Sequence, residues 1–126
     1  MKNAEGKESK LTYAGRYKCF DTFAPMGPWI VTRDEIADIG NCKMEARLND
    51  QAVQKGTTAD MVFKFPYLIS YFSGAHTLEP GDIISSGTCT FAPGWNLQNL
   101  DLRKIGGVLE SEVTEIGTMK NPIKPV

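Results

Sequence analysis

The first candidate for chemistry is a lysine in unusual surroundings. Lys18 is followed by CFDTFAPMGPW, a stretch that ends at Trp29 and holds aromatic residues, two prolines and a glycine. An ammonium group stabilises a developing enolate or oxyanion most where water is excluded, and apolar surroundings lower the pKa of a lysine. The residues alone also fit a lysine whose stem packs on Phe20 and Phe23 while its charge reaches water.

Other ionisable residues favour structural roles. His76 is the only histidine, and it lies near the end of an expected helix, where a cation suits the helix dipole. Glu110, Glu112 and Glu115 could suggest a metal cluster, but the first two share one face of an expected strand and fit its solvent-exposed face better. Asp60 is expected to cap or fix a turn.

Hydrophobic patterning predicts the elements that must position these residues. Lys43–Asn49 alternates strictly between polar and apolar residues, which is the period of a half-buried strand. Asn49-Asp50 tolerates left-handed dihedrals, so Gln51–Gln54 is expected to return as the second arm of a hairpin. One main helix is expected near 66–74, because Pro66 suits a first helical position and Gly74 a stop.

Further strands are expected around this hairpin and helix. They are predicted at Trp29–Thr32, at Ile83–Thr88 as a buried strand, at Val108–Glu115, and after a turn near Gly117. Leu78–Asp82 has the residues of a turn, and 90–107 is expected to be a long loop. Short strands with one helix predict a mainly β, α+β fold, a twisted sheet or roll, and not an alternating βαβ fold.

Composition sets the limits of class and location. The chain has 126 residues, of which 41% are hydrophobic, so we expect one folded domain over 12–126 after a flexible arm at 1–11. A net charge of −1 argues against a nucleic-acid partner, and no apolar run is long enough to span a membrane. Three widely spaced cysteines and the absence of a signal-peptide pattern predict reduced thiols in a cytoplasmic protein.

Three segments together resemble the C-terminal catalytic domain of the fumarylacetoacetate hydrolase family. They are GRYKCFDTFAPMGPWIVTRDEI, then ARLNDQAVQKGTTADMVFKFPYLISYFSGAHTLEPGDIISSGT, then VLESEVTEIGTMKNPI. Each is a weak pattern alone, but the three occur in the family's order and near its spacing. The resemblance implies a mixed β-roll and places Lys18 in a catalytic site, beside a metal-bound keto acid or diketone.

The resemblance also implies roles for two further pairs of residues. Gly87-Thr88 matches the family's Gly-Thr, whose hydroxyl and backbone amides lie close to the substrate carboxylate; the alternative for Thr88 is simply a strand end. Asp21 and Thr22 match positions that hold a loop or a second cation, with a turn-forming role equally open. The segment after Thr88 departs from the family pattern, as does Ile105-Gly106-Gly107.

The family's metal ligands have no counterpart in the first residues of the chain. The resemblance implies Mg²⁺, Mn²⁺ or Ca²⁺ held by an E-x-E pair and an aspartate before the lysine motif, together with a histidine–glutamate pair. Residues 1–17 contain Glu5 and Glu8 but no E-x-E. A hard cation needs several fixed oxygen ligands, so no metal ligand is assigned here.

Three functions follow from this incomplete set of residues. We expect a truncated family member without catalysis of its own, which self-associates, as a homodimer, through exposed sheet edges. The second hypothesis is an enzyme for 2-keto or 2,4-diketo acids. Another chain would supply the N-terminal half, with the metal ligands, and so complete its active site. The third is a module that binds keto acids or anions through Lys18 and Thr88.

Overall fold

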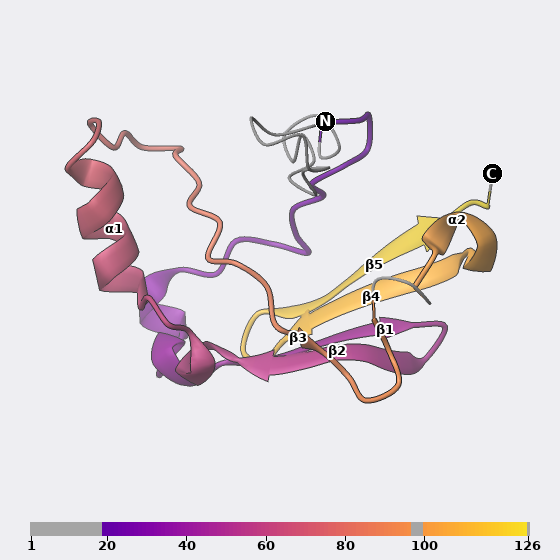
Figure 1. The fold of residues 1–126 in the computed structure, drawn as a ribbon. Coiled ribbons are helices and arrows are strands. Elements are labelled where there is room, and N and C mark those ends of the chain that lie inside the picture. Colours follow the sequence, from indigo (N-terminus) through magenta and orange to yellow (C-terminus); the bar gives the residue numbers. More distant parts are fainter. Residues whose placement is uncertain (1–18, 97–99, 126) are drawn as a thin grey trace, which may run out of the picture.

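A five-stranded sheet forms most of the structure. The computed structural model describes residues 19–96 and 100–125, and its strands follow the order β3-β2-β1-β4-β5 (Figure 1). The strands are β1 (Lys43–Leu48), β2 (Gln51–Thr57), β3 (Thr90–Phe91), β4 (Gly107–Val113) and β5 (Gly117–Ile123). All four pairings between them are antiparallel. The expected mainly β, α+β class is confirmed.

The β1–β2 hairpin forms as the alternating pattern predicts. Asn49 and Asp50 both have positive φ, at 50° and 67°, and join two strands that pair from Leu48 opposite Gln51. β2 continues to Thr57, beyond the expected Gln54, because the β1 register extends to Lys43. The register shifts between Ala46 and Arg47, where Val53 is the extra residue, and Val53 is almost fully buried.

The main helix is also confirmed, as α1 (Phe65–Ser73) with Gly74 as its C-cap. Figure 1 shows that α1 stands apart from the sheet, and a long connection leads from it to β3. Its Tyr67 and Tyr71 rings stack in a row with Phe63, and all three side chains are more than half exposed. No helix among the described residues is long and apolar enough to cross a membrane.

Short helical turns connect these elements. They are η2 (Arg33–Glu35), η3 (Ile39–Asn41), η4 (Thr58–Asp60) and the brief α2 (Leu102–Ile105). Thr58 is buried and links two of them, because its hydroxyl donates to Ile39 O at 2.7 Å and accepts from Cys42 N at 2.9 Å. Asp60 ends η4, which agrees with the turn expected there.

Two predicted strands are wrong. Trp29–Thr32 belongs to no strand, and Ile30 is 94% exposed. Ile83–Thr88 also belongs to no strand, Gly87 within it has a φ of 108°, and Ile83 is 70% exposed. A strand needs a backbone partner: β2 pairs only Gln54 and Lys55 with β3, and it ends at Thr57, directly before η4. The expected loop at 90–107 therefore contains β3 and α2.

Candidate functional site

The predicted Gly87-Thr88 pair borders a pocket of about 150 Å³ at the end of the β1–β2 hairpin. Its lining combines three sulfur-containing side chains, a carboxylate, several hydroxyls and two glycines: Met44, Met61, Cys89, Asp60, Thr57, Ser86, Thr88, Thr90, Gly56 and Gly87. β1, β2, η4 and the segment before β3 all contribute to it. Small-molecule sites commonly combine an apolar wall with a few polar groups, as this lining does.

The side chain of Gln54 holds one wall of this pocket. Gln54 Nε2 donates to Thr88 Oγ1 at 3.3 Å and to the Cys89 carbonyl oxygen at 3.1 Å. Thr88 is exposed, and its hydroxyl also lies 3.4 Å from the Cys89 carbonyl oxygen. The threonine is therefore fixed to β2 through a side-chain contact, although it lies outside the strands.

Gly56 allows the chain to pass close to β2 at this point. A Cβ atom on Gly56 would lie 2.5 Å from Cys89 Cβ, a separation that real side chains do not tolerate. Glycine inside a strand often marks such a close backbone approach. A glycine at this position of the strand is therefore the sequence signal for the pocket.

The lysine motif is described only in part. Lys18 lies outside the described residues, as does the arm expected at 1–11. Asp21 and Thr22 are exposed and occupy the middle of a turn in which Phe23 N donates to Phe20 O at 3.0 Å, with Thr22 at φ 69°. The structure does not bring Asp21 or Thr22 into the lining of the Gly87–Thr88 pocket.

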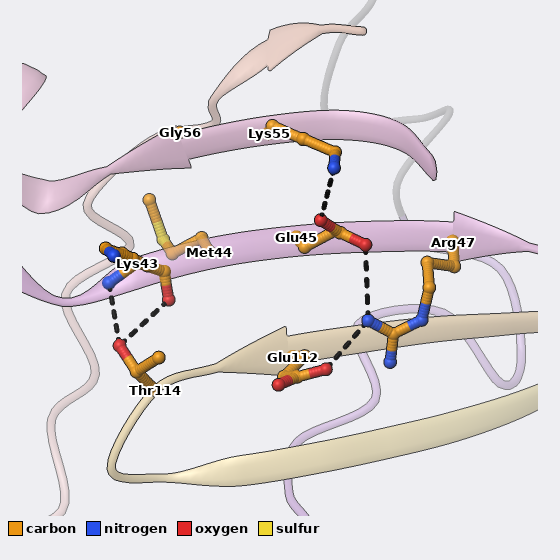
Figure 2. A pocket seen from close by; sticks show the side chains of 8 residues that line it. All are labelled: Lys43, Met44, Glu45, Arg47, Lys55, Gly56, Glu112 and Thr114. Atoms are coloured by element: carbon orange, nitrogen blue, oxygen red, sulfur yellow. Dashed lines mark hydrogen bonds and ion pairs between the residues drawn. The ribbon is translucent and has the colours of Figure 1, made fainter. Parts of the chain in front are cut away.

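A second pocket lies on the opposite, charged face of the sheet. Its volume is about 320 Å³, and Figure 2 shows Lys55 paired with Glu45, which pairs with Arg47, which pairs with Glu112. Arg47 Nε also contacts Glu110 Oε2 at 3.0 Å. These pairs follow the strand register, in which Lys55 is opposite Glu45 and Glu110 is opposite Arg47.

The face of β4 that carries Glu110 and Glu112, expected to be exposed to solvent, thus takes part in a network of ion pairs. Glu110 is only 9% exposed and lies between Arg47 and Lys120. Hydrogen bonds from Lys120 and then Arg47 hold the pKa of Glu110 below its ordinary value, and Lys55 lowers the pKa of Glu45 in the same way. The carboxylates around Arg47, Glu112 first, raise the pKa of its guanidinium. Three carboxylates and three cations balance here, which indicates a structural role.

This network predicts a specific response to acid. The pKa of Glu110 is lower in the folded chain than its ordinary 4.5, so its contribution to stability is complete above that value and is lost as the pH falls through the folded pKa. We expect Glu110→Gln to lower the stability near neutral pH and to flatten the loss of stability between about pH 6 and about pH 3. Urea unfolding at several pH values measures both effects.

Glu79→Gln is the control for this experiment. Glu79 is an exposed glutamate in the turn after α1, where Asp82 N donates to its carbonyl oxygen. Its replacement should leave the pH dependence of unfolding unchanged. An equal pH dependence in the Glu110→Gln variant and the parent chain would contradict the role of Glu110.

The described residues offer no ready cation site. Across residues 19–96 and 100–125, no group of three histidine, cysteine, aspartate or glutamate side chains is placed to hold a metal ion. The three glutamates considered from the sequence are separated, because Glu110 and Glu112 are ion-paired to Arg47 and Glu115 is in the β4–β5 turn. No chemical step is therefore derived through a metal on these residues.

The model for the fumarylacetoacetate (FAA) hydrolase C-terminal domain matches residues 4–124, which is nearly the whole chain. The chain belongs to the fumarylacetoacetate hydrolase family. The resemblance seen in its three motifs is confirmed.

Particular relatives define the class more closely. The chain is 38% identical over 115 residues to the fumarylacetoacetate hydrolase domain-containing protein 2 homolog of Dictyostelium discoideum, and this match covers 85% of the chain and 38% of that protein. It is 40% identical over 106 residues to the mitochondrial oxaloacetate tautomerase FAHD2A of Homo sapiens, covering 84% of the chain and 33% of that enzyme. The chain thus spans about a third of the length of these curated relatives.

Solved structures agree with this placement. The crystal structure of maleylpyruvate hydrolase from Sphingobium sp. SYK-6 matches with a TM-score of 0.71 and 32% identity, over 85% of this chain and 37% of that one. The same enzyme in complex with manganese(II) ion and pyruvate matches with a TM-score of 0.70 and 32% identity, over 84% of this chain and 37% of that one. Two of these relatives are thus named as an oxaloacetate tautomerase and a maleylpyruvate hydrolase.

Proposed function

We propose that this chain is the keto-acid-binding part of a metal-dependent enzyme that acts on 2-keto or 2,4-diketo acids. The reaction would be a hydrolysis, a decarboxylation or an isomerisation. We further propose that the chain binds such acids weakly and does not turn them over without residues beyond those described. The observation that carries the proposal is the position of Gly87-Thr88 at the edge of a pocket, at the place in the chain that the family motif gives.

The residues would divide the work between binding and charge stabilisation. The Thr88 hydroxyl and the neighbouring backbone amides would donate hydrogen bonds to the substrate carboxylate. Lys18, assigned through its motif, would lie beside the carbonyl oxygen and stabilise the enolate that forms there. Ligands outside the described residues would hold Mg²⁺, or Mn²⁺ as in the relative whose structure contains manganese(II) and pyruvate. The bound metal would polarise the carbonyl group of the keto acid.

The proposed enzyme requires an additional polypeptide segment that supplies the metal ligands. The α1 helix leaves Tyr67, Ile69 and Tyr71 more than half exposed, and Ile83 in the following segment is 70% exposed. Apolar side chains gathered in this way usually mark a protein interface. We propose that a segment carrying the acidic metal ligands covers this surface. The homodimer expected from the sequence stays a prediction that sedimentation velocity can decide.

Calorimetry with oxalate tests the binding proposal. Oxalate presents two planar carboxylates, so it resembles the carboxylate and enolate of a keto acid. We expect the chain to bind oxalate weakly without added metal, and Thr88→Val to weaken that binding about fivefold, because the lost hydroxyl donates to an anion. Thr77→Val, at an exposed threonine after α1, is the matched control and should leave the affinity unchanged.

Two results would contradict the proposal. Oxalate binding that is absent, or that is equal in the Thr88→Val variant and the parent chain, would remove Thr88 from the site. Turnover of oxaloacetate can be monitored by the ultraviolet absorbance of its enol form. Turnover by the chain alone with Mn²⁺ would show that the described residues and Lys18 suffice for catalysis.

A further inference from the structure

Gln54 uses its side-chain amide nitrogen on the segment that carries the candidate site. Nε2 donates to Thr88 Oγ1 at 3.3 Å and to the Cys89 carbonyl oxygen at 3.1 Å. The orientation of the side-chain amide follows from the second contact, because a carbonyl oxygen accepts hydrogen bonds and cannot donate them. The half-buried Gln54 thus links the middle of β2 to two consecutive residues of the pocket wall.

Other restraints on this segment are few. The β2–β3 ladder pairs only Gln54 with Phe91 and Lys55 with Thr90, and it is extended by the Ala92 N–H, which donates to Val53 O at 2.8 Å. Residues 83–89 precede the ladder and belong to no strand. The bare backbone of Gly56 provides room for Cys89 beside β2. The Gln54 amide therefore supplies a fixed attachment at the point where the ladder ends.

We propose that Gln54 is a positioning residue that sets the direction of the Thr88 hydroxyl for an anionic ligand. This inference rests on the proposed function of Thr88. A hydroxyl has one proton and two lone pairs, and the Gln54 N–H occupies one lone pair. The Thr88 proton then points away from Gln54, and also away from the Cys89 carbonyl oxygen, which lies 3.4 Å from Thr88 Oγ1 and 3.1 Å from Gln54 Nε2. A carboxylate in the pocket is a stronger acceptor than this distant carbonyl.

Two variants of Gln54 separate hydrogen-bond donation from side-chain size. Gln54→Met keeps the length but has no N–H, whereas Gln54→Glu keeps the shape and only accepts hydrogen bonds near neutral pH. Gln51→Met is the matched control, because Gln51 is an exposed glutamine three residues earlier on the same strand. Far-UV circular dichroism and thermal unfolding establish that each variant is folded.

Hydrogen exchange measures the positioning without any ligand. We expect Gln54→Met and Gln54→Glu to speed the exchange of the backbone amides of residues 90–92 about fivefold, while exchange in β4 stays unchanged. Gln51→Met should change neither region. Equal exchange in the Gln54 variants and the parent chain would overturn the inference, even if the chain binds no oxalate at all. Failure of the inference is thus distinguishable from failure of the proposed function.

A double-mutant cycle tests whether Gln54 acts through Thr88. Without added metal, each Gln54 variant should weaken oxalate binding about threefold to fivefold in the parent chain. The same variants should have no further effect on oxalate affinity in the Thr88→Val background, because the hydroxyl they orient is gone. Additive losses, or wild-type affinity in Gln54→Glu, would show that hydrogen-bond donation to Thr88 is not the function of Gln54.

Discussion

Replacing Gly107 with alanine is expected to lower the free energy of unfolding by about 3 kcal/mol. Gly107 has a φ of +99°, a region that residues with a side chain occupy at an energetic penalty. A Cβ atom there would also overlap the side chain of Asn49. That side chain cannot easily move, because Oδ1 accepts from Val108 N at 2.9 Å and Nδ2 donates to Gly106 O at 3.2 Å.

Gly81→Ala provides the control for backbone strain alone. Gly81 has a nearly equal φ of +104°, but a Cβ atom there would have nothing within 4 Å. Its replacement should therefore lower the free energy of unfolding by only about 1–2 kcal/mol. Urea unfolding followed by circular dichroism measures both variants. Equal losses in the two variants would mean that the Asn49 contacts at the start of β4 contribute little.

The second large effect is expected from a fully buried side chain at the end of β1. Leu48 is 2% exposed and stands opposite Leu109 of β4 and Gln51 of β2. Leu48→Ala removes buried methyl groups and leaves a cavity, so we expect a loss of about 3 kcal/mol in the free energy of unfolding. With few fully buried residues in the described chain, including Val53 at 1% exposed, little else can compensate.

Leu68→Ala is the matched substitution for this prediction. Leu68 is half-buried in α1, the helix that stands apart from the sheet, so the same chemical change should reduce stability by about 1 kcal/mol or less. Chemical unfolding of the two variants gives the comparison. A loss in Leu68→Ala that equals the loss in Leu48→Ala would contradict the placement of the main core beneath β1 and β2.

The sequence by itself determined the local elements and the family. Alternation in Lys43–Leu48, the Asn49-Asp50 turn, and Pro66 and Gly74 around α1 act over a few residues, and each appears as predicted. The three motifs identified the family because their order along the chain can be read without coordinates. The sequence also predicted which face of β4 is polar, but it did not predict how buried the side chains on that face are.

Only the tertiary structure decided which segments pair and what surrounds each side chain. Ile83–Thr88 has the composition of a strand, yet the ladder on β2 begins at Thr90, because β-pairing depends on a partner that is distant in the sequence. Glu110 became buried for the same reason, since Arg47 and Lys120 reach it from neighbouring strands. The contact of Gln54 with Thr88 joins residues 34 positions apart, and no local pattern encodes a contact over that separation.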